Sequence, residues 1–108
     1  MNNLFETKKV FNFENDIDYA KGGVVSKQVT KNEAGNITLF SFDEGQGLTE
    51  HKAPFDAVVQ ILDGEAEIRI DGTPFLLKKG ESIIMPANHP HALQAIKPFK
   101  MLLTMIKG

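Results

Sequence analysis

Hydrophobic and polar residues alternate along much of the chain with a period of two. In the segment Glu65–Ile70, alanine and isoleucine occupy every second position, and charged residues occupy the positions between them. This alternation is typical of a β-strand with one buried face, because successive side chains of a strand point to opposite sides. We interpret seven other segments as strands: residues 24–30, 36–44, 57–63, 73–80, 82–86, 91–96 and 99–106. Gly, Pro, Asn and Asp residues separate them.

No segment shows the 3.6-residue period of a convincing amphipathic helix, and residues 13–23 are the only candidate for a helical turn. Short strands separated by turn residues indicate an all-β, antiparallel sandwich or barrel. We expect a single barrel over residues 23–108. We expect the more polar segment before it, residues 1–22, to be an arm that packs on the barrel or on a partner subunit.

Composition excludes several classes of protein. The 108 residues suffice for one domain, and a net charge of −2 with a single arginine, Arg69, gives no positive field to attract nucleic acid. No cysteine is present, which excludes disulfides and thiolate metal sites. The start of the sequence lacks the apolar core of a signal peptide, so we expect none, and no apolar run approaches the ~20 residues of a membrane span. We therefore expect a cytoplasmic protein without nucleic-acid or membrane partners.

Two histidines that are far apart in the sequence, His51 and His91, each stand at the start or end of a predicted strand. Alternate residues of every strand in a barrel face the interior, so distant side chains can meet there. Counting by twos from the two histidines, and along the last strand, predicts one pocket for a small-molecule ligand. Its residues are His51, Ala53, Phe55, Ala57, Val59, His91, Leu93, Met101 and Leu103.

Two motifs surround these histidines. The first is G-x-x-x-H at Gly47–His51, followed by VVQILDGEAEI; the second is G-x-x-x-x-x-P-x-N-x-x-H from Gly80 to His91. Together they resemble the two motifs of the cupin superfamily, and the chain is most similar to its small, stand-alone members. The resemblance implies a jelly-roll barrel, or antiparallel double-stranded β-helix. Asn88 replaces the usual glycine, which is tolerable because asparagine enters the left-handed conformation more easily than most residues.

The resemblance also implies four metal-ligand positions, of which this chain keeps His51 and His91. Alanines, Ala53 and Ala57, stand where the family has a histidine and a glutamate. Asp56 has the opposite parity on its strand and is expected to point away from the pocket. Two imidazoles bind Zn, Ni, Mn or Fe only weakly, because a protein metal site normally has at least three ligands.

We derive two functional hypotheses. In the first, the barrel binds a small organic molecule, with His51 and His91 as hydrogen-bonding groups in the pocket. In the second, the chain is a metal-dependent cupin enzyme of the dioxygenase, isomerase or lyase type, with the same histidines as ligands. Catalytic residues are not identified, and enzymatic activity is left open. The resemblance further implies a homodimer, in which the segment with Phe5, Phe11 and Phe13 could cover an edge strand of the partner.

Overall fold

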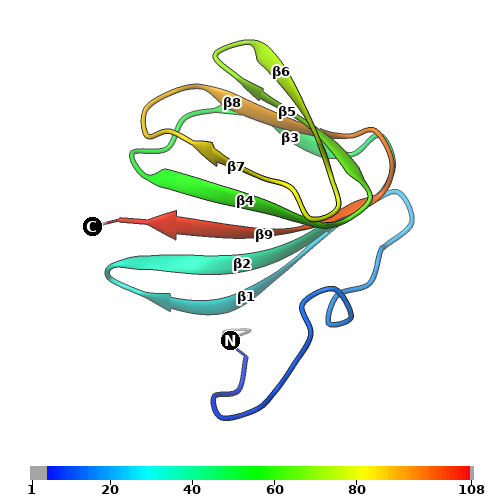
Figure 1. Cartoon of the computed structure of the whole chain (residues 1–108), viewed down its shortest axis with the longest axis vertical. Coiled ribbons are helices and arrows are strands. Elements are labelled where there is room, and N and C mark those ends of the chain that lie inside the picture. Colours follow the sequence, from blue (N-terminus) through cyan, green and yellow to red (C-terminus); the bar gives the residue numbers. More distant parts are fainter. Residues whose placement is uncertain (1–4, 108) are drawn as a thin grey trace.

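The structure is a computed structural model that describes residues 5–107 of the chain. All regular secondary structure in this part is β-strand, as the alternating pattern predicts. No helix among the described residues is long and apolar enough to cross a membrane. The strands, labelled in Figure 1, are β1 (Val24–Asn32), β2 (Gly35–Phe42), β3 (Gly47–His51), β4 (Asp56–Asp63), β5 (Glu65–Ile70), β6 (Thr73–Lys78), β7 (Ser82–Met85), β8 (His91–Ala95) and β9 (Phe99–Ile106).

The strands form two antiparallel sheets (Figure 1). The five-stranded sheet has the order β1-β2-β9-β4-β7, and the four-stranded sheet has the order β3-β8-β5-β6. Each sheet joins strands from distant parts of the chain; β4, for example, pairs with both β7 and β9. This architecture confirms the predicted all-β double-stranded β-helix.

The main core lies between the two sheets and follows the predicted alternation. Ala66 and Ile68 of β5 are fully buried, whereas Arg69, the residue after Ile68, is exposed. Phe42 of β2 and Phe99 of β9 stack with ring centroids 4.6 Å apart and bury both rings completely. Such burial stabilises the fold by roughly 1.5–3 kcal/mol for each large apolar side chain.

The segment that was the only helix candidate, residues 13–23, contains turns and no helix. The amide of Asn15 donates to the side-chain oxygen of Asn12 at 3.1 Å, which closes one of these turns. The backbone carbonyl of Asp18 accepts a hydrogen bond from Ser41 Oγ at 2.8 Å, which ties this segment to β2.

The arm packs on the outer face of the five-stranded sheet beside β1 (Figure 1). Ile17, which is 1% exposed, fills a second apolar cluster with Val29 and Leu39. The amide of Phe5 donates to the carbonyl of Val29 at 3.0 Å. Residues 1–4 of the predicted arm, and Gly108 at the end of the predicted barrel, lie outside the described residues. A contact between the arm and a partner subunit stays a prediction.

Candidate functional site

His51 and His91 meet on neighbouring strands of the four-stranded sheet. They are register partners in the antiparallel pair β3–β8, and their Nε2 atoms lie 3.1 Å apart. The two rings meet edge to face, with centroids 4.3 Å apart. His91 is 5% exposed, whereas His51 is an exposed residue. The pair therefore reaches from the solvent into the barrel.

The turn before β8 holds the second histidine in place. Asn88 has a φ of 67°, which is the left-handed conformation that its sequence position predicts. Its amide donates to the carbonyl of Ala53 at 2.8 Å, and the amide of Ala87 donates to Asp56 Oδ1 at 2.9 Å. These two bonds connect the two sequence motifs directly. The Asp56 carboxylate thus binds the turn, and Asp56 is not part of the cavity lining that contains the histidine pair.

Backbone carbonyls fix the orientation of both imidazoles. Nδ1 of His51 lies 2.7 Å from the carbonyl oxygen of Thr49, and Nδ1 of His91 lies 3.2 Å from that of His89. A carbonyl oxygen can only accept, so each Nδ1 carries the hydrogen and donates it. In the neutral rings, both Nε2 atoms are then bare acceptors that face each other. A proton or a cation between them, or a donor hydrogen that both share, removes this repulsion.

A cavity of about 220 Å³ opens beside the histidine pair inside the barrel. Among the described residues, the two histidines are the only polar side chains in its lining. The full lining is Leu48, His51, Ala53, Phe55, Ala57, Met85, His91, Leu93, Met101, Leu103 and Met105. The site is therefore an apolar cavity with one polar end.

Eight of the nine predicted pocket residues line this cavity, and Val59 does not. The structure places Val59 outside the lining, because it lies one inward position farther along β4 than Ala57, in the packed core with 0% exposure. The prediction missed Leu48, Met85 and Met105. Met105 follows Met101 and Leu103 by steps of two, so the alternation contained this signal. That these residues bind a ligand stays a prediction.

The short side chains of Ala53 and Ala57 leave part of the cavity volume unfilled. On the five-stranded sheet, Ala57 lies between its register partners, Met85 of β7 and Met105 of β9. All three side chains line the cavity, and the space over Ala57 is the space that a longer side chain would occupy. His89 lies apart on the surface, where its Nδ1 is 2.7 Å from Asp71 Oδ2.

The pair fits only part of the metal site that the resemblance implies. Two ligands about 2.0–2.1 Å from one metal at a tetrahedral angle lie roughly 3.3 Å apart, which is close to the Nε2 separation of 3.1 Å. Carbonyl partners on Nδ1 are also usual for metal-bound imidazoles. However, no group of three or more His, Cys, Asp or Glu side chains within residues 5–107 could hold a metal. The described residues therefore do not form a complete protein metal centre.

Burial, followed by the neighbouring His51, lowers the pKa of His91 below the usual 6.5. The unfolded chain then takes up a proton that the folded chain excludes, so stability is complete above pH 6.5 and falls as the pH decreases below it. We expect the free energy of unfolding to fall by at most about 1.4 kcal/mol per pH unit from this group.

Urea unfolding between pH 8 and pH 5 would measure this slope. The His91→Gln variant should lose that part of the pH dependence. Leu93→Val, which alters a cavity neighbour that binds no proton, should shift the curve without changing its slope. Parallel curves for the wild type and His91→Gln would show that His91 does not titrate in this way.

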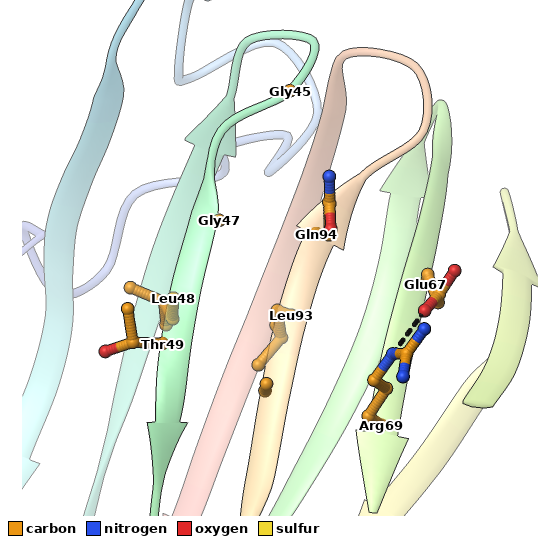
Figure 2. A pocket seen from close by; sticks show the side chains of 9 residues that line it. Gly45, Gly47, Leu48, Thr49, Glu67, Arg69, Leu93 and Gln94 are labelled. Atoms are coloured by element: carbon orange, nitrogen blue, oxygen red, sulfur yellow. Dashed lines mark hydrogen bonds and ion pairs between the residues drawn. The ribbon is translucent and has the colours of Figure 1, made fainter. Parts of the chain in front are cut away.

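An open groove of about 390 Å³ lies along β3, β8 and β5 (Figure 2). In Figure 2, Glu67 and Arg69 point toward each other, and Arg69 Nε donates to Glu67 Oε2 at 2.6 Å. These charges satisfy each other, and no histidine lines the groove. The enclosed cavity at the histidine pair is therefore the better candidate site.

Comparisons with known proteins agree with this architecture. The family model described as Cupin domain matches residues 38–106. A conserved protein of unknown function from Streptococcus pyogenes is 38% identical, with a TM-score of 0.92; the match covers 99% of this chain and 93% of that protein. A cupin superfamily protein from Desulfitobacterium hafniense is 28% identical, with a TM-score of 0.85, over 96% of this chain and 94% of that protein.

A cupin 2 conserved barrel domain protein from Leptotrichia buccalis is 45% identical, with a TM-score of 0.87. The match covers 90% of this chain but 47% of that protein, so the chain spans about half of its length. No curated protein matches the chain. The matched family model extends over more than half of the sequence and includes both histidines, and the chain therefore belongs to the cupin family.

Proposed function

We propose that this small cupin barrel binds a compact, largely apolar organic molecule in its interior. The observation that carries the proposal is the 220 Å³ cavity, whose lining is apolar except for His51 and His91. Small-molecule sites are mostly apolar, with a few polar groups that fix the orientation of the ligand. Since an apolar cavity of about 150 Å³ binds benzene, this cavity has room for one ring with small substituents.

Thermal unfolding with toluene and with p-cresol tests the proposal. A molecule that binds only the folded chain raises Tm by mass action, with a stabilisation of about 2.7 kcal/mol at one hundred times its Kd. We expect at least one of the two compounds to raise Tm of the wild type. Ala53→Leu, which fills the cavity, should abolish the shift.

Ala92→Leu is the matched control, because Ala92 lines the outer groove and not the cavity. This variant should keep the ligand-induced shift. The proposal fails if neither compound raises Tm of the wild type. It also fails if Ala53→Leu and Ala92→Leu respond to the compounds in the same way.

A second candidate function is binding of a divalent metal, as in metal-dependent cupin enzymes. The specific observation that favours it is the convergence of two Nε2 atoms whose Nδ1 hydrogens are held by carbonyls. With two protein ligands, Zn, Ni, Mn or Fe would bind weakly and would exchange. This candidate explains the retained histidines, but it does not explain the apolar cavity beside them.

The predicted homodimer remains part of the proposal, as does a cytoplasmic location. Support for the dimer comes from apolar side chains on the free edges of both sheets. Phe75 and Leu76 of β6 are 40% and 58% exposed, and Ile84 of β7 is 61% exposed. Burial of these side chains against a second copy would cover edges that otherwise invite pairing with other chains.

A further inference from the structure

The polar end of the cavity presents acceptors and no fixed donor. Both imidazoles donate Nδ1–H to backbone carbonyls, so their Nε2 lone pairs are left for a ligand. The other lining side chains are Leu, Ala, Phe and Met, which cannot donate a strong hydrogen bond. A ligand with only acceptor atoms would therefore lose hydrogen bonds to water and gain none inside.

The apolar end of the cavity favours an aromatic ring. Met85, Met101 and Met105 all line the cavity together with Phe55. Thioether sulfurs make favourable contacts with aromatic rings, of about 0.3–1.5 kcal/mol each, and methionine adapts its shape to a planar guest. The volume of about 220 Å³ limits the ligand to one ring with small substituents.

We propose that the ligand is a single-ring phenol, with its hydroxyl group donating to the paired Nε2 atoms of His51 and His91 and its ring against the methionines. This inference rests on the proposed function and specifies the class of ligand. The two Nε2 atoms lie 3.1 Å apart, so their lone pairs can share one hydroxyl hydrogen. An ether or a hydrocarbon has no such hydrogen to donate.

A carboxylate is the main competing class of ligand. The ammonium group of Lys107 lies 5.3 Å from the ring centroid of Phe55, but Lys107 is not part of the cavity lining. Without a cation in the lining, a buried carboxylate would lose its hydration and gain no ion pair inside the cavity. We therefore expect a phenol to bind more tightly than the corresponding benzoate.

Titration calorimetry at pH 7.5 with five compounds of similar size tests the inference. They are p-cresol, toluene, 4-methylanisole, 4-methylbenzoate and 4-methylcyclohexanol. We expect p-cresol to bind about tenfold or more tightly than each of the others, a ratio that one satisfied hydrogen bond or several ring contacts can supply. Equal binding of p-cresol and 4-methylcyclohexanol would overturn the aromatic assignment. Tighter binding of 4-methylbenzoate would overturn the phenol assignment.

Variants separate this inference from the proposed function. His51 is exposed, so His51→Leu should fold, and it should lose most of the tenfold preference for p-cresol over toluene. His89→Leu, at a histidine outside the cavity lining, should keep the preference. If p-cresol, toluene and 4-methylanisole bind equally and Ala53→Leu blocks them all, the inference fails and the proposed function holds. If none of the five compounds binds, both fail.

Discussion

The Gly64→Ala variant is expected to lose more than about 3 kcal/mol of stability, or to remain unfolded. Gly64 connects β4 to β5 with a φ of 80°, a conformation that costs a residue with a Cβ atom roughly 1–2 kcal/mol. A Cβ at this position would also overlap the carbonyl oxygen of Pro98. Because that contact is with backbone, no change of rotamer can relieve it, and the start of β9 would have to move.

Gly72→Ala is the matched control for this prediction. Gly72 also has a φ of 80°, but a Cβ there would meet no atom within 4 Å. It should therefore lose only the conformational part, roughly 1–2 kcal/mol. At about 4–8 °C for each kcal/mol in a domain of this size, Gly64→Ala should lower Tm by at least about 12 °C. Similar Tm values for the two variants would show that the close approach to Pro98 is relieved elsewhere.

Gly64 also illustrates what sequence alone can predict about this fold. The alternation on either side of it predicts the two strands, and a glycine between two strands predicts a tight turn. The approach of Pro98 is a contact between residues far apart in the chain. Local pattern fixes which face of a strand is buried, but it does not determine how closely another segment passes.

In the candidate site, too, local pattern predicts some features and the folded sheets determine the others. Counting by twos predicts that His51, Ala53, Phe55 and Ala57 share one face. All four line the cavity, so the chain at Pro54 preserves the alternation. The same counting placed Val59 in the cavity and missed Met85. Parity gives the face of a strand but not the depth at which the core closes. Met85 reaches the cavity because it is the register partner of Ala57, and register between strands is a property of the folded sheet.

The orientation of the imidazoles could not be predicted from sequence. In the structure, His91 lines the cavity and His89 lies outside the lining. It contains no information about the carbonyls of Thr49 and His89, which hold Nδ1 of each ring. Those contacts make both Nε2 atoms acceptors. They therefore determine which chemical groups the cavity can take.

Ala57→Glu is expected to create a metal site in the cavity. The new carboxylate would project from β4 into the cavity that His51 and His91 line from the opposite sheet. Two histidines and one carboxylate are the donor set of non-haem iron sites, and they also suit Mn and Ni. We expect the affinity for Mn²⁺ to rise by about 100-fold or more over the wild type, measured by titration calorimetry.

Ala57→Gln separates the carboxylate from the effect of size, because glutamine fills the same space without a charge. Both variants should lose about 1–3 kcal/mol of stability without metal, since each buries a polar group beside Met85 and Met105. Only the glutamate variant should recover stability when Mn²⁺ is added, and Ala57→Glu combined with His51→Leu should not. If Ala57→Glu and Ala57→Gln both bind Mn²⁺ no more tightly than the wild type, the glutamate does not reach a point shared with both imidazoles. If the wild type itself binds Mn²⁺ as tightly as Ala57→Glu, two imidazoles are already sufficient, and the metal-binding function replaces the organic ligand as the main proposal.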